Sequence, residues 1–275
     1  MFAKPRHTRS GTSGTLAFLE QVYFGTVRSM RKSSGRNAVL GLIGSMAQTV
    51  VFVMALYFMF QLMGVRTSPI NGDYMLYIIS GIAMFITHNT AVQSVSKAEG
   101  PTSGMMQHAP MNTMIAVCSA ALQSLCQQNI TIGTILLIYH LAFNPVCIFN
   151  PIGLAGVFLL SWFTGVAIGM VFLALTPWHL PLVNILLMVY RRVNTLASGK
   201  MFVANTLPSF MLAMFDWNPL FHCVDQARGM MLINYSPMHS NLSYPLKVAL
   251  VAVVLGLMGE FFTRKRASIS WGSIR

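Results

Sequence analysis

The sequence contains no aspartate, glutamate, lysine or arginine anywhere between Glu99 and Arg191. Residues 37–65 and 74–96 are free of these four charged residue types as well. A helix that crosses a bilayer needs about 20 mostly apolar residues, so these stretches have room for several crossings. Only 9% of the whole chain is charged, too little to cover the surface of an ordinary soluble domain. The sequence therefore excludes a soluble globule and a disordered chain, and predicts an integral membrane protein.

Prolines and polar clusters divide the uncharged stretches into separate helices. The predicted spans lie at about residues 39–63, 74–94, 113–142, 152–176, 182–199 and 244–263. The expected fold class is therefore an all-α integral membrane protein with six transmembrane helices. An even number of spans places both ends of the chain on the same side of the membrane.

The distribution of positive charge predicts which side that is. The net charge is +12, and the basic residues on the side of the termini are Lys4, Arg6, Arg9, Arg28, Arg31, Lys32, Arg36, Lys97, Arg264, Lys265, Arg266 and Arg275. The opposite side has only Arg66, Lys200, Arg228 and Lys247. Basic loops stay in the cytoplasm, so both termini are expected to be cytoplasmic. The charge is thus a topology signal and an attraction to anionic lipids, and it requires no nucleic-acid partner.

The two ends of the chain are expected to differ from the spans. Residues 1–14 are small, polar and basic, and we expect a disordered tail; residues 264–275 form a second cytoplasmic tail. Within residues 15–36, Leu16, Leu19, Tyr23, Val27 and Met30 recur at helical spacing. This pattern predicts an amphipathic helix in the headgroup plane. A cytosolic extension that packs on nothing in particular is the alternative.

Residues 199–243, between the fifth and sixth spans, form a long connection that is only moderately polar. Its first apolar run, from Phe202 to Phe215, is too short to cross a bilayer and suits a re-entrant helix. Asn218 and Pro219 then provide an N-cap and a first-turn proline for a second short helix. On that helix Asp225 and Arg228 are three residues apart and can pair, with His222 on the same face. A capped surface helix with a weak ion pair is the alternative interpretation.

This part of the sequence resembles a known family. The run Asn218-Pro219-Leu220-Phe221-His222-Cys223-Val224-Asp225-Gln226-Ala227-Arg228 is similar to the signature of ABC-2 type transporter permeases, above all those that export capsule and O-antigen polysaccharides. Ser198-Gly199, Phe202 and Leu207-Pro208 match the same family upstream. The family usually has glutamate in place of Asp225, and more charge in the loop that corresponds to residues 95–112.

The resemblance implies a function and a set of site residues. It implies a permease subunit, with residues 37–263 as its transmembrane domain, that moves a lipid-linked polysaccharide across the bacterial inner membrane as two copies with two ATPase subunits. Ser198, Gly199, Phe202, Asn218, Pro219, His222, Asp225 and Arg228 would form an outer gate. Lys97, Glu99, Gly100 and Pro101, with Glu20 and Arg28, would contact the ATPase. The chain has no GxxxxGK[ST] phosphate loop, so ATP and Mg²⁺ would bind to the partner and no cofactor to this chain.

Arg191 and Arg192 lie about ten residues into the fifth predicted span. Charged residues inside spans usually face a water-filled cavity or a helix bundle. They are therefore predicted to face the pore or the subunit interface. The alternative is a misplaced boundary, with residues 177–192 as an interfacial segment.

Other chemistry has less support in the sequence. His88 and His140 lack zinc-site spacing and are expected to be hydrogen-bonded structural residues, and the four cysteines form no paired motif. An intramembrane transferase would need acidic pairs or an activated nucleophile, but only six acidic residues exist and none is in the middle of a span. An ion-coupled carrier would need buried carboxylates and an internal repeat. Export of a smaller lipid or drug by an ABC-2 permease remains the alternative for the substrate.

Overall fold

The computed structural model describes residues 11–33, 38–62, 74–99, 113–142 and 145–272, and its regular elements over those ranges are helical. In chain order they are α1 (Gly11–Ser33), α2 (Ala38–Leu62), α3 (Tyr74–Ser96), α5 (Thr113–Ala142), α6 (Pro151–Leu175), α7 (Leu180–Ala197), the short 3₁₀ helix η1 (Ala204–Thr206), α8 (Ser209–Phe215), α9 (Pro219–Met231) and α10 (Ser243–Gly272). The predicted all-α class is therefore confirmed.

Every predicted span coincides with a helix to within a few residues, but both ends of the chain differ from the prediction. Helix α1 begins at Gly11, inside the stretch predicted to be a disordered tail, whose residues 1–10 lie outside the described ranges. Helix α10 continues to Gly272, well past the predicted end of the last span at 263. The positively charged residues after Thr263 interrupt the apolar sequence, but they are all compatible with a helix.

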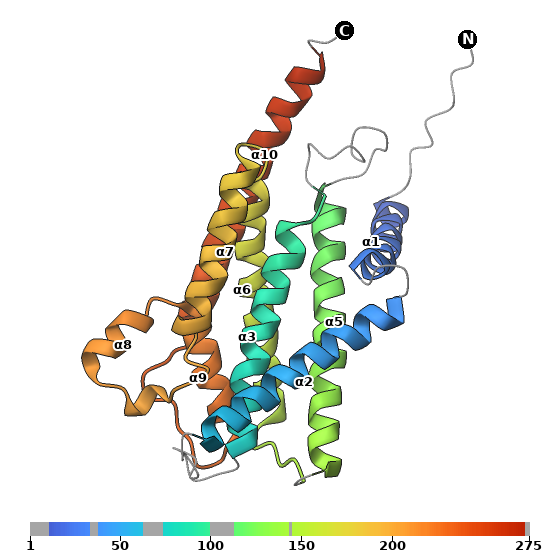
Figure 1. Cartoon of the computed structure of the whole chain (residues 1–275). Helices are drawn as coiled ribbons and strands as arrows, with labels where there is room; N and C mark the ends of the chain where they lie inside the picture. Colours follow the sequence, from blue (N-terminus) through green and yellow to red (C-terminus); the bar gives the residue numbers. More distant parts are fainter. Residues whose placement is uncertain (1–10, 34–37, 63–73, 100–112, 143–144, 273–275) are drawn as a thin grey trace.

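Helix α3 is the central element of the bundle, and it packs against α5, α6 and α9 (Figure 1). Most of its side chains are buried, including Ile78, Ile82, Val92 and Val95. Glycines allow α6 to approach it closely. A Cβ atom on Gly165 would lie 2.5 Å from the carbonyl oxygen of His88, and one on Gly169 would lie 2.9 Å from the Cβ of Val95. Small residues four apart are typical of helix contacts in membranes.

The opposite face of α6 contacts α10 in the same manner. A Cβ atom on Gly256 would lie 2.8 Å from the Cβ of Met170, and one on Gly259 would lie 2.8 Å from the Cβ of Ala174. The remaining surface of α10 is apolar and exposed, with Leu246, Leu250, Val251, Val254, Leu255, Met258, Phe261 and Phe262. An apolar surface of this size is unusual for a soluble protein and suits contact with lipid.

Three helices among the described residues are long and apolar enough to cross a membrane: α3 over Met75–Ser96, α6 over its whole length, and α10 over Ser243–Thr263. They support a membrane protein. Helix α5 is longer but less apolar, because amides and hydroxyls occupy the stretch from Gln123 to Thr134. Helix α7 contains Arg191 and Arg192. Several side chains of α2 are not described, and the apolar stretch found in that helix is the short segment Met46–Ala55.

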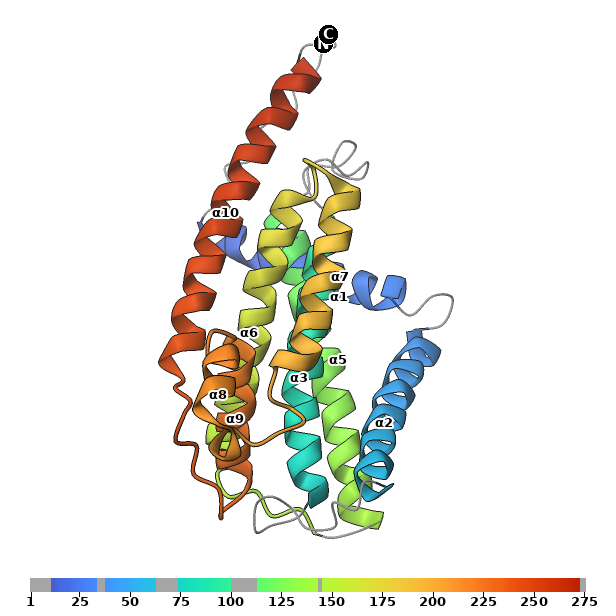
Figure 2. The ribbon, with the colours of Figure 1, turned by 60° about the vertical axis from the view of Figure 1, so that its left-hand side comes forward.

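The two ends of the bundle carry different parts of the chain. Helix α1 and the last part of α10 lie at one end, and α8 and α9 lie toward the other (Figure 1). Helix α1 runs across the bundle instead of along it (Figure 2). Its Val22 is buried against α5, where the Ser119 hydroxyl donates to the Val22 carbonyl oxygen at 3.2 Å. Leu16, Leu19 and Tyr23 are each at least 60% exposed, as an interfacial helix requires.

The close contact of α6 with α3 predicts a large difference between two glycine substitutions on one helix. Gly169→Leu forces a side chain into the backbone of α3, and overpacking of this kind typically costs about 1–3 kcal/mol. Gly156→Leu is the matched control, because nothing lies within 4 Å of a Cβ atom there. Thermal unfolding in detergent should show a lower melting temperature for Gly169→Leu alone. Equal melting temperatures would contradict the packing described.

Candidate functional site

Helix α9 is buried at the end of the bundle away from α1, and it contacts α3, α6 and α10. Ten of its 13 residues are buried, so it is not a surface helix. Its position follows from its first residues. The Asn218 side chain accepts from the Leu220 N–H at 3.0 Å and caps the helix, and Pro219 occupies the first turn. The Asn218 amide also donates to the side chain of Asn194 and to the Ala197 carbonyl oxygen, which attaches α9 to the end of α7.

Arg228 makes the second connection between α9 and the end of α7. Its Nη1 donates to the Phe202 carbonyl oxygen at 2.7 Å and its Nη2 to the Lys200 carbonyl oxygen at 2.8 Å. Its guanidinium carbon lies 4.1 Å from the centre of the Tyr77 ring, and the residue is 1% exposed. A buried charge needs such partners, because burial without hydrogen bonds is very costly. The Arg228 side chain therefore fixes the turn after α7, although the two are 28 residues apart in the sequence.

Two glycines make this arrangement possible. Gly199 has a φ of +72°, which side chains rarely adopt, and a Cβ atom there would lie 2.8 Å from the Phe221 ring. A Cβ atom on Gly81 of α3 would lie 2.9 Å from the Arg228 Nη2 and 3.2 Å from the Cα of Lys200. The turn at Lys200 and the guanidinium of Arg228 therefore occupy the space that a side chain at position 81 of α3 would fill.

Asp225 connects α9 to the chain that follows it. Its carboxylate accepts from the Tyr235 hydroxyl and, at 2.7 Å, from the Ser240 hydroxyl. Burial and the nearby carboxylate raise the pKa of Tyr235, so the phenol stays protonated and donates. The amide of Gln226 also donates to the Ser240 side chain and carbonyl oxygen at 3.0 Å. Asp225 therefore fixes the segment that leads into α10.

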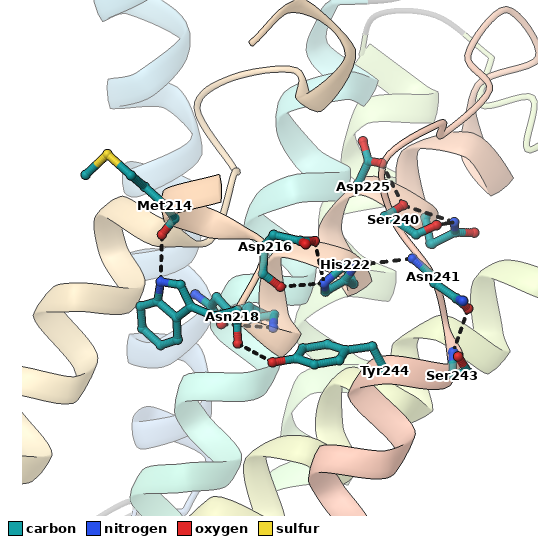
Figure 3. Close-up of polar contacts among 12 residues, drawn as sticks. Met214, Asp216, Asn218, His222, Asp225, Ser240, Asn241, Ser243 and Tyr244 are labelled. Atoms are coloured by element: carbon teal, nitrogen blue, oxygen red, sulfur yellow. Dashed lines mark hydrogen bonds and ion pairs between the residues drawn. The ribbon is translucent and has the colours of Figure 1, made fainter. Parts of the chain in front are cut away.

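His222 is another polar residue of α9 that bonds to other segments, and its ring lies between Asp216 and Asn241 (Figure 3). Its Nε2 lies 2.8 Å from the Asp216 carbonyl oxygen and 3.3 Å from the Asp216 carboxylate. Its Nδ1 accepts from the Asn241 N–H at 3.2 Å. A neutral ring with its proton on Nε2 satisfies both contacts. The Tyr244 ring lies 4.9 Å away and its hydroxyl donates to the Trp217 carbonyl oxygen, which connects α9 to the first turn of α10.

The predicted gate residues are thus brought together, but one predicted interaction is not formed. Asp225 and Arg228 lie on the same buried helix, yet each has partners from other segments. The prediction of a direct Asp225–Arg228 pair is wrong, because the two charged groups bond to different neighbours: Arg228 donates to backbone carbonyl oxygens, and Asp225 accepts from hydroxyl groups. Ser198 is buried, with its N–H donating to the Asn194 carbonyl oxygen, and the Phe202 ring packs 4.9 Å from Phe215.

The other predicted site residues lie elsewhere. Arg191 and Arg192 are exposed on α7, and their predicted role at a pore or subunit interface stays a prediction. Lys97, Glu20 and Arg28 are exposed and Glu99 is half-buried, near the α1 end of the bundle. Gly100 and Pro101 lie outside the described residues. The ATPase contact predicted for these residues therefore stays a prediction too.

Sequence reasoning missed several partners that complete the site. Tyr77, Gly81, Lys200, Tyr235 and Ser240 all contact the predicted residues, but no motif singles them out. Lys200 is 3% exposed, and its ammonium lies 3.3 Å from the centre of the Phe85 ring. The long connection 199–243 was the signal available for Lys200, Tyr235 and Ser240, and it does not identify individual residues; nothing in the sequence of α3 singles out Tyr77 or Gly81.

His88 and His140, which were both expected to be hydrogen-bonded structural residues, each have a hydrogen-bond partner. The His88 ring contacts the Thr164 hydroxyl at 3.0 Å and the Tyr190 hydroxyl at 2.8 Å, which connects α3 to α6 and α7. His140 accepts from the Val146 N–H at 3.0 Å at the end of α5. Within the part of the chain that is described, no three metal-binding side chains gather, and the four cysteines are free thiols.

Comparison with models of known protein families and with curated proteins finds no match to this chain. The function proposed below therefore rests on the residues and geometry of the chain itself.

The buried position of Lys200 predicts a pH dependence of stability. Burial lowers the pKa of its ammonium from the usual value to about 8. Between pH 8 and the higher pKa of the unfolded chain, the unfolded state binds more protons, so raising the pH over this range favours the folded state. Lys200→Met removes this effect, whereas Lys247→Met, at an exposed lysine, keeps it.

The measurement is the melting temperature in detergent at several pH values from 7 to 10. Relative to Lys200→Met, the wild-type chain and Lys247→Met should both become more stable above about pH 8. Parallel profiles for all three chains would contradict the assignment of a buried lysine.

Proposed function

We propose that this chain is the transmembrane permease subunit of an ABC-2 type exporter that moves a lipid-linked cell-surface polysaccharide across the bacterial inner membrane. The observation that carries the proposal is the site around α9. Eight residues chosen for their resemblance to this family, from Ser198 to Arg228, gather around one buried helix at one end of the bundle. Five of the eight belong to α9 or its N-cap, and the turn with Ser198, Gly199 and Phe202 is brought to them by the hydrogen bonds of Asn218 and Arg228.

The arrangement of the helices is compatible with six crossings. Helices α2, α3, α5, α6, α7 and α10 alternate in direction, and α1 and the last part of α10 lie at the opposite end of the bundle from α8 and α9 (Figure 1). In this proposal α2, α5 and α7 cross the membrane as well, and their polar residues face protein or water instead of lipid. Segment 199–243 is then the re-entrant element, with α9 inserted among the ends of α3, α6 and α10.

Energy for transport comes from a separate ATPase in this proposal, because the chain contains no phosphate-binding loop. The partner docks at the α1 end of the bundle, where Glu20, Arg28 and Lys97 are exposed. Two copies of the chain with two ATPases enclose the path, and α7 with Arg191 and Arg192 faces it or the second copy.

The role of α9 in this proposal is to close the outer mouth of the path. Arg228 and Asn218 hold the end of α7 on α9, and Asp225 and His222 hold the start of α10. A displacement of α7 or α10 driven from the cytoplasmic side therefore reaches α9 through hydrogen bonds to buried groups. Loss of one partner in such a site leaves a buried polar group unpaired.

The proposal predicts that Arg228→Ala abolishes export of polysaccharide while the chain still associates with its ATPase. Without the guanidinium, the carbonyl oxygens of Lys200 and Phe202 lose their donors and the turn after α7 is released. Asp225→Asn should weaken export less, because the amide retains an oxygen that accepts one of the two hydroxyls. Surface polymer is measured in cells that express the chain with its ATPase.

Membrane abundance and co-purification of the ATPase are the controls. Lys247→Ala, at an exposed lysine near the start of α10, is the matched basic substitution and should export normally. Normal surface polymer with Arg228→Ala would overturn the gate. Robust ATP hydrolysis by the purified chain alone would overturn the permease proposal itself.

A further inference from the structure

Helix α5 contains a run of uncharged polar side chains in its middle, where a membrane span is normally most apolar. Gln123, Ser124, Gln127, Gln128, Asn129, Thr131 and Thr134 fall within little more than three turns. No acidic or basic residue accompanies them. The polar run is the reason why α5, at 30 residues, is not among the most apolar helices of the chain.

The part of this run that faces the bundle is hydrogen-bonded to neighbouring groups, except that the buried side-chain oxygen of Gln128 has no partner among the described residues. The Gln128 amide donates to the Thr90 hydroxyl of α3 at 3.1 Å, and the Ser124 hydroxyl donates to its own helix backbone. The Gln123 amide donates to the Gln127 side chain at 3.1 Å, one turn further along. These contacts account for the buried amides as ordinary packing between α3 and α5.

The outward side of the same run leaves one amide, that of Asn129, without such an account. Cys126, Asn129 and Gly133 are exposed on one face of α5, which also exposes Leu122, Ile130 and Leu137. Gln127 and Thr134 are half-exposed beside them, and the Thr134 hydroxyl donates to the Ile130 carbonyl oxygen at 2.8 Å. The side-chain amide of Asn129 makes no hydrogen bond to any described residue. Nothing lies within 4 Å of a Cβ atom on Gly133. Helix α5 also contacts α1 and α2, but Cys126, Asn129 and Gly133 remain exposed among the described residues.

Lipid is a poor environment for the exposed amide of Asn129. An amide in the hydrocarbon region without a partner loses its hydrogen bonds to water and gains nothing in return. Polar side chains within spans accordingly face protein or a water-filled cavity. The exposed face of α10 consists of leucine, valine, methionine and phenylalanine side chains, and it shows what a lipid-facing helix of this chain looks like.

We propose that the face of α5 formed by Cys126, Gln127, Asn129, Gly133 and Thr134 lines a water-filled path and contacts an uncharged, hydroxyl-rich substrate there. Amides donate and accept at once, which matches the hydroxyl groups of a neutral sugar chain. The absence of charged residues from 100 to 190 gives this wall no preference for an ionic ligand. The inference rests on the proposed export function, and it assigns to the path a wall that is separate from the gate around α9.

The native thiol of Cys126 reports whether water reaches this face. A variant that retains Cys126 alone, with Cys118→Ala, Cys147→Ser and Cys223→Ala, is treated in membranes with a charged, water-soluble methanethiosulfonate, with the ATPase present and absent. A variant that retains Cys147 alone is the exposed-loop control, and a cysteine-free chain with Leu255→Cys is the lipid-facing control, because Leu255 is 56% exposed in the middle of α10.

Cys126 should react within about tenfold of the rate of Cys147, and Leu255→Cys should react far more slowly, because a thiolate forms only in contact with water. Failure of Cys126 to react, while an uncharged lipid-soluble maleimide modifies it, would overturn the inference in favour of a lipid-facing helix. Oxidative cross-linking of Cys126 to Cys126 of a second copy, without reaction with the charged reagent, would overturn it in favour of a dry helix contact.

Transport separates this inference from the proposed function. Asn129→Leu should lower export severalfold with normal abundance, and Asn129→Ser, which keeps a hydroxyl, should lower it less. Leu255→Ala, on the apolar face of α10, should export normally. Export by the wild-type chain with Asn129→Leu unaffected and Cys126 unreactive would contradict the path wall alone. Reaction of Cys126 with no polysaccharide exported by the wild-type chain would retain the path and contradict the substrate.

Discussion

The buried guanidinium of Arg228 joins parts of the chain that otherwise have little reason to stay together. It donates to two carbonyl oxygens of the turn after α7 and lies on the ring of Tyr77 in α3, with Gly81 leaving the space for it. Helix α7 makes few other contacts with the bundle. Because a buried charge is tolerated only with such partners, the position of α9 and the conformation of the turn depend on each other. The gate proposed for segment 199–243 follows from this dependence.

Asp225 plays the corresponding part toward α10, so α9 connects two helices that are separated by a long stretch of sequence. The two charges act on different neighbours and not on each other. A substitution at Arg228 should therefore mainly change the conformation of the turn after α7. A substitution at Asp225 should mainly change that of the segment before α10. Helix α3 supplies the fixed frame for both, since α5, α6 and α9 all pack on it.

The helices were predictable from the sequence because their signals are local. The uncharged stretches predict where helices lie, and Asn218-Pro219 predicts where α9 begins. Asn218 caps α9 as predicted, and Asn150 caps α6 in the same way. The resemblance placed Phe202 in the same gate as Arg228, but nothing in the sequence predicted that its backbone carbonyl would accept from the guanidinium, and Lys200 and Tyr77 carry no motif that links them to Arg228. The pairing of Asp225 with Arg228 followed from spacing along one helix alone, and spacing says nothing about the carbonyls and hydroxyls that other segments bring.

The central claim is that the site around α9 lies on the opposite side of a membrane from both termini. Single cysteines at Ser10, Ser236 and Ser273 in a cysteine-free chain test it directly with a membrane-impermeant maleimide in intact cells. Only Ser236→Cys, whose position lies in the exposed connection between α9 and α10, should be labelled before the cells are opened, and all three should be labelled afterwards. Labelling of Ser10→Cys or Ser273→Cys in intact cells, or protection of Ser236→Cys, would contradict the account.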